Sequence, residues 1–540
     1  MPIDTASMST IESSEPGRAN TGSTEHHEDI DALGKEQGLD ASELASLVAC
    51  ARASGATRQQ LPGVLRQACS RLDNLRSHAF RDLAGELPAG ETAAAVALAR
   101  QALQAGPSFS LEAAEQAFGE ALAHCLQDSA ATPGRVASIA AGQAEVAAAA
   151  QLHRKAAELY AKVAKVPGLD AAMQWQFEYG RAAVLDELGR EYGEDEALQE
   201  AVELYENSVL PLAPRSERPA DWSATQHALG NALGILGQRG RGIRLLERSV
   251  EAFENALGER SREQTPMEWA ASRHGLANAL GLLAQRQQDL DMLELAVSEF
   301  ERAIEARDRE RTPWDWAMTQ YHLGTALLTL GQLKHDSAIV ARSVAAYQQA
   351  LTEWTRERAP LDWARTENSL ASALRVRGEQ DGDPRALEQA VSAYRSALTL
   401  LTREQWPAEW ALIQNNLGAA LHKLGEQEND TSFLGEAVTA YENALQELSR
   451  EGKPLAWAMT CANLGSARRG LAERTRDIEI SLQAVADFEA VAEVFHDASH
   501  PRYYHLAKEQ LAHARKLTAE LVGGDDRVTS RLDSSGIDRR

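Results

Sequence analysis

Seven tryptophans recur at a strict interval of 47 residues in this chain of 540 residues. They are Trp175, Trp222, Trp269, Trp316, Trp363, Trp410 and Trp457. A proline stands three residues before each of the last six, and an arginine stands four residues before each of those prolines, from Arg215 and Pro219 onward. A period of about 20–50 residues is typical of solenoids and propellers, in which each repeat contacts its neighbours. The tryptophans therefore predict a repeat array.

Each repeat has the pattern of two helices. Thr265, Pro266 and Glu268 have the order of an N-cap, a first helical residue and a capping box. Twenty residues after most tryptophans an aspartate recurs, which predicts the N-cap of a second helix. These aspartates are Asp289, Asp336, Asp383, Asp430 and Asp477. No stretch alternates with a period of two, so we expect helices and no strands.

Two further patterns recur within the repeats. Leu–Gly pairs lie near the middle of the predicted first helices, at Leu229–Gly230, Leu323–Gly324, Leu417–Gly418 and Leu464–Gly465. Triplets spaced by four and three residues lie in the second helices, such as Ala296/Phe300/Ala303 and Ala390/Tyr394/Ala397. Together they resemble the tetratricopeptide repeat (TPR), in a long-period bacterial-type variant, since the family unit has about 34 residues. The resemblance implies an all-α, right-handed superhelical solenoid of about nine antiparallel helix pairs.

The pattern also predicts the organisation of the chain. We expect the TPR-like array at residues 89–500, with the 47-residue period from about residue 172, and a capping helix at 501–520. A helical segment at 29–88 precedes the array and shows no family pattern. The polar ends at 1–28 and 521–540 cannot bury enough apolar surface to offset ordering, so we expect disordered tails.

Charge and composition exclude several classes of function. The chain has 55 Lys and Arg against 79 Asp and Glu, a formal charge of −24, which disfavours nucleic acid and anionic membranes as partners. No secretory signal and no long apolar run appear, and the four cysteines form no CxxC motif, so we expect a cytoplasmic protein without a metal or other cofactor. Catalytic signatures are lacking, and an enzyme within residues 1–130 is disfavoured because that region is rich in Ala and reads as helix. The prediction is a protein that is not an enzyme.

The tryptophans and arginines have structural explanations. We expect the tryptophans to be largely buried at repeat junctions, which we favour over an exposed ladder for ligand stacking. We expect the recurring arginines to cap carbonyls or pair with acids at the end of the preceding second helix, although a functional arginine stripe is an alternative.

The resemblance implies a partner-binding groove lined by residues of the first helices. In TPR arrays, positions two before, two after, five after and six after the repeat leucine line the concave wall. Together with a neighbouring arginine, the predicted groove residues are His227, Asn231, His274, Asn278, Tyr321, Arg365, Asn368, Arg375, Asn415, His422, Lys423 and Arg469. Asn and His side chains can bond a peptide backbone, and the basic residues could receive an acidic or carboxylate-bearing segment. A merely solvated polar inner face is the alternative.

These observations predict a non-catalytic scaffold or adaptor that binds a peptide segment or helix of a partner protein. The alternative is a regulatory or sensor subunit of a bacterial signalling or defence complex, in which the segment 29–88 contacts a separate effector protein.

Overall fold

The described part of the chain consists of helices joined by turns and short loops. The computed structural model describes residue 34 and residues 39–57, 60–76, 90–104, 109–128, 131–240, 242–497 and 500–523, and none of these residues lies in a β-strand. The predicted tail at 1–28 and residues 524–540 of the predicted tail at 521–540 lie outside the described residues. The helices of the described ranges confirm the predicted all-α fold.

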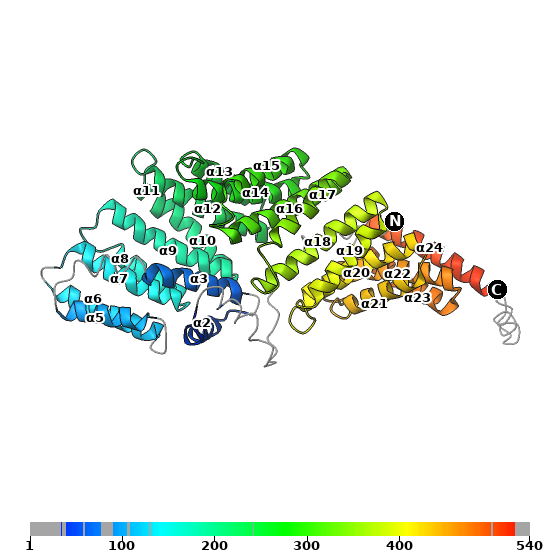
Figure 1. The fold of residues 1–540 in the computed structure, drawn as a ribbon, viewed down its shortest axis with the longest axis horizontal. Coiled ribbons are helices and arrows are strands. Elements are labelled where there is room, and N and C mark those ends of the chain that lie inside the picture. Colours follow the sequence, from blue (N-terminus) through cyan, green and yellow to red (C-terminus); the bar gives the residue numbers. More distant parts are fainter. Residues whose placement is uncertain are drawn as a thin grey trace. The chain divides into compact units, whose positions relative to one another are not determined.

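The chain divides into two compact units, and the division falls within the helix α16 (Pro313–Lys334) (Figure 1). We call residues 21–322 the N-terminal unit, and the unit that contains residues 323–540 the C-terminal unit.

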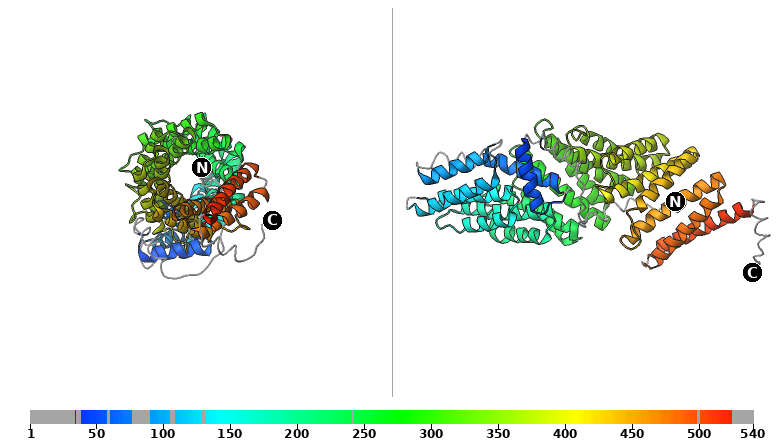
Figure 2. Two further views of the ribbon diagram at one scale, coloured as in Figure 1. Left: turned by 90° about the vertical axis from the view of Figure 1, so that its right-hand side faces the viewer. Right: turned by 90° about the horizontal axis from the view of Figure 1, so that it is seen from below.

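The N-terminal unit holds a hairpin followed by successive antiparallel helix pairs. Its helices before α16 are α2 (Ala41–Ala53), α3 (Leu61–Asn74), α5 (Glu91–Ala102), α6 (Leu111–Gln127), α7 (Pro133–Ala149), α8 (His153–Val163), α9 (Ala171–Tyr192), α10 (Asp195–Leu204), the π-helix η3 (Tyr205–Val209), α11 (Leu210–Leu212), α12 (Pro219–Gly240), α13 (Ile243–Leu257), α14 (Pro266–Gln287) and α15 (Leu290–Ala306). From α5 to α10 and from α12 to α15, each helix packs against the next one along the chain. The α2–α3 hairpin (dark blue in Figure 2) instead runs across the direction of the blue and cyan helices that follow it.

The C-terminal unit continues the pattern and ends in a single helix. Its helices after α16 are α17 (Ser337–Ala350), α18 (Pro360–Asp381), α19 (Pro384–Leu398), α20 (Pro407–Glu428), α21 (Thr431–Leu445), α22 (Pro454–Thr475), α23 (Ile478–Asp497) and α24 (Pro501–Gly523). The pairs α18/α19, α20/α21 and α22/α23 are in contact, and α24 packs on α23. The predicted helix pairs and closing helix are thus confirmed, and α24 extends three residues beyond the predicted end at 520.

In several TPR-like pairs a glycine of the first helix packs against an aromatic ring of the second. A Cβ atom built at Gly324 would lie 2.9 Å from the ring of Tyr347, and one at Gly418 would lie 2.9 Å from the ring of Tyr441. Gly230 faces the ring of Phe253 in the same way in the N-terminal unit, at 3.0 Å. Because these glycines lie directly against the rings, the Leu–Gly pattern and the aromatic pattern describe one contact, although Ala277 and Ala371 stand at the equivalent position of two other repeats.

The junction inside each pair repeats with the same period. Asp289, Asp336, Asp383, Asp430 and Asp477 all accept backbone N–H groups of the second helix, as predicted. The residue just before each aspartate has a left-handed backbone, with φ of 55° at Gln288, 52° at His335, 66° at Gly382, 53° at Asn429 and 59° at Arg476. One left-handed residue followed by one N-cap therefore connects the two helices.

This junction supports a prediction on stability. Replacing Gly382→Ala should lower the free energy of unfolding by about 1 kcal/mol, because a Cβ atom disfavours the left-handed backbone. A Cβ at Gly382 would meet no atom within 4 Å, so the cost is conformational. The exposed Arg476 offers the reverse change, and Arg476→Gly should raise stability by about 0.5 kcal/mol. Denaturant titration of both variants tests this, and effects of the same sign would contradict it.

The predicted capping box at the start of the first helix is wrong. Thr265 occupies the N-cap position of α14, but its side chain makes no capping hydrogen bond. Its hydroxyl instead donates to the carbonyl oxygen of Ser261 in the preceding turn, at 3.3 Å. Thr312 donates to the Asp308 carbonyl oxygen in the same way, at 3.0 Å. The threonine hydroxyl therefore forms its hydrogen bond within the turn between repeats, and not with the backbone N–H groups at the start of the helix.

The periodic tryptophans lie beneath arginine side chains. Trp316 is buried, with 8% of its surface exposed, while the other six are half-buried and none is exposed. Four of the six recurring arginines stack as cations on the aromatic face of the tryptophan in their own repeat. The guanidinium lies 4.8 Å from the ring centre for Arg215 on Trp222 and 4.6 Å for Arg309 on Trp316. In the C-terminal unit the distances are 5.5 Å for Arg356 on Trp363 and 5.6 Å for Arg403 on Trp410.

The same arginines pair with acids, but not on the predicted helix. Arg215 pairs with Glu259 at 2.6 Å and Arg262 with Glu305 at 3.0 Å, at the ends of α13 and α15. In the C-terminal unit Arg403 pairs with Glu447 and Arg450 with Glu493. These acids belong to the second helix that follows each arginine, not to the one that precedes it. The turn holding the arginine lies beside the end of the next second helix, so the arginine joins two successive repeats.

Candidate functional site

In the N-terminal unit, the predicted groove residues are engaged in hydrogen bonds with one another and with the next repeat. His227 Nδ1 lies 3.2 Å from the Ser272 hydroxyl, and Asn231 Nδ2 lies 3.1 Å from His227 Nε2. One repeat later, His274 Nδ1 lies 3.2 Å from the Thr319 hydroxyl, and Asn278 Nδ2 lies 3.0 Å from His274 Nε2. Since the asparagine NH₂ donates to Nε2, each neutral imidazole donates through Nδ1 to the next repeat.

These histidines are held neutral by their surroundings. Burial, with Arg260 nearby, lowers the pKa of His227 to about 3. Burial and the neighbouring His322 and Arg307 lower the pKa of His274 well below its usual value. The ring of His322 stacks on Phe300 at a centroid distance of 6.2 Å, and burial with Arg307 lowers its pKa to about 4. Tyr321, also predicted in the groove, lies beside His322 at 5.4 Å between ring centres.

The α2–α3 hairpin lies on the first helices of the N-terminal unit. Arg71 of α3 forms ion pairs with Glu145 of α7 at 2.8 Å and with Glu187 of α9 at 2.5 Å. Glu187 follows Ala182 by five residues, and Ala182 lies one period before Leu229, so Glu187 occupies a predicted groove position. Burial opposes ionisation of Glu187, but Arg71 and His153 together lower the pKa of its carboxyl to about 2. An arginine of the chain's own hairpin thus binds at a position where a partner was expected.

Two further contacts extend this interface. The Arg66 guanidinium of α3 lies 4.0 Å from the ring centre of Trp314, at the start of α16. Gly63 leaves no room for a Cβ atom beside the Glu191 carboxylate at the end of α9. The hairpin therefore contacts α7, α9 and the start of α16.

The predicted groove residues of the C-terminal unit differ, because several carry buried polar atoms without a partner. Among the described residues, no hydrogen-bond partner is found for Asn368 Oδ1, Arg375 Nε, Asn415 Oδ1 or Arg469 Nε. Asn368 and Asn415 are one period apart, and Arg375 and Arg469 are two periods apart with His422 between them. Equivalent positions of different first helices thus carry asparagine oxygens without a donor and arginine Nε groups without an acceptor.

The other basic residues of this set have acidic neighbours. Arg365 pairs with Glu409 at 2.9 Å, and Arg375 Nη1 pairs with Glu379 at 2.5 Å. His422 and Lys423 both approach Glu426, at 3.6 and 3.5 Å. The predicted basic stretch is therefore neutralised in part by acids of the same first helices.

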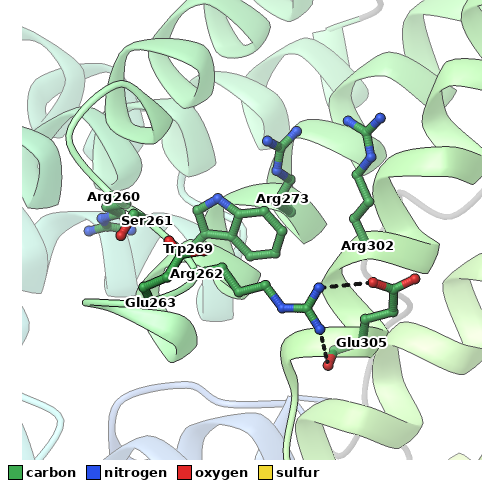
Figure 3. A pocket seen from close by; sticks show the side chains of 8 residues that line it. All are labelled: Arg260, Ser261, Arg262, Glu263, Trp269, Arg273, Arg302 and Glu305. Atoms are coloured by element: carbon green, nitrogen blue, oxygen red, sulfur yellow. Dashed lines mark hydrogen bonds and ion pairs between the residues drawn. The ribbon is translucent and has the colours of Figure 1, made fainter.

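An arginine-lined cleft of about 450 Å³ lies in the N-terminal unit, between the start of α14 and the end of α15 (Figure 3). Arg260, Arg262, Arg273 and Arg302 line it around Trp269. Arg273 lies 4.7 Å from the ring centre of Trp269. Sequence reasoning missed this cleft, although the signal was present, because Arg273 and Arg302 interrupt positions that hold uncharged or acidic residues in the other 47-residue repeats.

The described ranges contain neither a metal-binding cluster nor a helix that could span a membrane. Within them, no group of three or more His, Cys, Asp or Glu residues could hold a metal ion. No helix in the described part of the chain is both long and apolar enough to cross a membrane. Cys50, Cys69, Cys125 and Cys461 are free thiols, and burial raises the pKa of each of them.

Comparison with known proteins finds likeness in solved structures alone. No family model matches the chain, and no curated protein sequence matches it. The C-terminal part of a TPR repeat-containing protein from Cytophaga hutchinsonii is 13% identical, with a TM-score of 0.34, over 57% of this chain and 98% of that one. A Rap protein complexed with Competence and Sporulation Factor is 13% identical, with a TM-score of 0.35, over 82% and 99% of the two chains. The TPR2AB domain of yeast Sti1, in a complex with pHSP90, is 16% identical, with a TM-score of 0.19, over 53% and 99%. At TM-scores of this size, the description as TPR-like rests on the contacts within this chain.

Proposed function

We propose that this chain is a non-catalytic protein-interaction scaffold that binds a peptide segment along the first helices of its C-terminal unit. The observation that carries the proposal is the set of buried polar atoms without partners on Asn368, Arg375, Asn415 and Arg469. A buried polar group that lacks a hydrogen bond costs about 1–3 kcal/mol, and such groups are rare in folded proteins. A ligand that supplies the missing partners would recover that free energy on binding.

The chemistry of these atoms fits an extended peptide. An asparagine amide can accept from a peptide N–H and donate to a peptide C=O, so one asparagine per repeat can hold the backbone with little demand on its sequence. The arginine Nε groups add donors suited to a carboxylate. Because Arg365, Arg375 and Lys423 already face Glu409, Glu379 and Glu426, an acidic side chain of the peptide would compete with these internal acids. We therefore expect an acidic or carboxylate-bearing segment of the peptide to bind at the Nε groups of Arg375 and Arg469, which have no hydrogen-bond partner among the described residues.

Asn415 provides the test, because a binding role and a structural role predict opposite changes in stability. Asn415 is 2% exposed, so Asn415→Leu removes an unsatisfied polar group from a buried position and should raise stability by about 1 kcal/mol without ligand. The same change should weaken binding of peptides about tenfold, because a hydrogen bond in the complex is lost. The peptides are those selected from a displayed random library with the full-length chain as bait.

Asn231 of the N-terminal unit is the matched control. Its amide is hydrogen-bonded to His227, so Asn231→Leu should lower stability and leave the affinity of the selected peptides unchanged. If Asn415→Leu destabilises the chain as Asn231→Leu does, or binds the peptides at full strength, the proposed site is refuted.

One observation also favours a regulatory subunit as a second candidate. The α2–α3 hairpin, which belongs to the segment 29–88, is held on the first helices of the N-terminal unit by Arg71 and Arg66. Such a hairpin could respond to an effector protein by leaving these helices. This role predicts that release of the hairpin changes the set of bound proteins, whereas a simple scaffold predicts that the set stays the same.

A further inference from the structure

The arginine-lined cleft of the N-terminal unit is specific to one repeat. Arg262 belongs to the arginine series of the array, but Arg273 and Arg302 do not. The positions equivalent to Arg273 hold Gln226, Gln320, Glu367, Gln414 and Cys461, and those equivalent to Arg302 hold Asn255, Gln349, Ser396, Asn443 and Ala490. The repeat fold therefore does not require an arginine at either position.

Glu299 holds two of these arginines beside each other. One carboxylate oxygen of Glu299 pairs with Arg273, and the other accepts from Arg302 Nη1 at 2.9 Å. Glu299 is 3% exposed, so it lies behind the two guanidinium groups. Figure 3 shows the guanidinium groups of Arg273 and Arg302 next to one another at one side of the cleft. The two positively charged guanidinium groups repel each other, and an anion bound between them would reduce this repulsion.

The remaining donors converge on the same cleft. Arg262 pairs with Glu305, whose side chain is 61% exposed and could move aside for a ligand. Within the described residues Arg273 Nε is buried and lacks a hydrogen-bond partner. Four arginines thus line one cleft on a chain whose formal charge is −24, with Glu263 and Glu305 in the lining, Glu299 behind Arg273 and Arg302, and Glu268 near Arg260.

We propose that this cleft binds a phosphate group, either as the free anion or on a phosphorylated side chain. The argument for phosphate over a carboxylate is charge. Arg262, Arg273 and Arg302 each already pair with a carboxylate, so another single negative charge gains little by exchange. A phosphate brings about two negative charges and three acceptor oxygens, which suit several guanidinium groups at once. The volume of about 450 Å³ lies within the usual range for small-molecule sites. This site lies in the other unit from the proposed peptide groove and does not depend on it.

Calorimetric titration of the full-length chain with inorganic phosphate at pH 8 and constant ionic strength tests the proposal. We expect saturable binding that weakens at least tenfold in Arg302→Gln. That variant should fold, because the Arg302 side chain is 52% exposed and Gln349 stands at the equivalent position of the next repeat. Arg311→Gln is the matched control, since it removes the same charge from an 85% exposed side chain of the same unit and should bind as the wild type does.

Two further titrants separate the possible ligands. A phosphoserine peptide that binds more tightly than free phosphate would identify a phosphorylated protein as the ligand, and the reverse order would identify the free anion. Succinate that binds as tightly as phosphate would overturn the assignment to phosphate. Equal affinity of the wild type and Arg302→Gln, or no saturable binding of phosphate or the phosphoserine peptide, would overturn the site itself.

Discussion

Lowering the pH from 7 to 5 should destabilise the N-terminal unit strongly, because three of its histidines are held neutral in the folded chain. The pKa values of His227 and His322 are lowered to about 3 and about 4, and that of His274 is lowered well below its usual value by burial and by the neighbouring His322 and Arg307. An unfolded histidine titrates near pH 6.5. Above that pH neither state binds the proton, so the full stability is present.

The sign follows from proton binding. As the pH falls below about 6.5, the unfolded chain takes up protons that the folded chain excludes, so the free energy of unfolding decreases. The loss is at most about 1.4 kcal/mol for each histidine and pH unit, or roughly 4 kcal/mol per unit for the three together. It continues until the folded histidines titrate near pH 3 to 4.

Hydrogen exchange of the full-length chain at several pH values, corrected for intrinsic rates, would locate this loss. We expect α12, α14 and α16 to lose protection between pH 6.5 and 5. Asparagine stands at the slot of His227 and His274 in two other repeats, as Asn368 and Asn415, and at the slot of His322 as Asn416. The triple variant His227→Asn, His274→Asn, His322→Asn is therefore the control. If it loses protection over the same pH range as the wild type, histidine protonation is not the cause.

Arg71→Met should lower the stability of the N-terminal unit by about 3–5 kcal/mol. The change removes the cation between Glu145 and Glu187, and Glu187 is 3% exposed. Leaving a buried carboxylate without its cation is among the costliest substitutions in proteins. Because the pKa of Glu187 is lowered to about 2 in the folded chain, this stabilisation is present above its unfolded pKa of about 4.3 and is lost as the pH falls toward 2.

Urea denaturation at pH 7 measures the effect, and Arg154 supplies the matched control. Arg154 also pairs with two glutamates, Glu194 and Glu200, but its side chain is 50% exposed. Arg154→Met should therefore cost at most about 1 kcal/mol. Equal effects of the two variants would show that the Arg71 pairs contribute no more than surface pairs. Arg71→Met also weakens the attachment of the α2–α3 hairpin, whose apolar side chains still pack on α7, so comparing the proteins bound by it and by the wild type separates a regulatory subunit from a simple scaffold.

The parts of the fold that could be predicted from the sequence are those with local causes. The N-cap role of Asp383 depends on backbone groups two residues away, and the contact of Gly324 with Tyr347 lies within one helix pair. Both are visible as periodic residue types. The pairing of Arg262 with Glu305 was placed on the wrong helix because the register between neighbouring pairs comes from packing, which the period alone does not determine.

The candidate sites depend more on long-range contacts. No pattern in the sequence joins Arg71 to Glu187, which is 116 residues further along the chain. The hydrogen bonds from His227 to Ser272 and from His274 to Thr319 had a signal, since Thr225, Ser272 and Thr319 recur three residues after a tryptophan. That Asn368 and Asn415 carry a buried oxygen without a hydrogen-bond partner among the described residues could not be predicted, because it depends on packing between neighbouring helices.

The stacking of arginine on tryptophan and its ion pair with the next acid also bear on how the array could change length in evolution. Arg215 stacks on Trp222 in its own repeat and reaches forward to Glu259, and Arg403 uses Trp410 and Glu447 in the same way. A gene deletion or duplication of 47 codons would rejoin an arginine to an equivalent tryptophan and acid, whereas one of another length would leave one arginine without them. We therefore expect natural length variants of this array to differ by whole repeats.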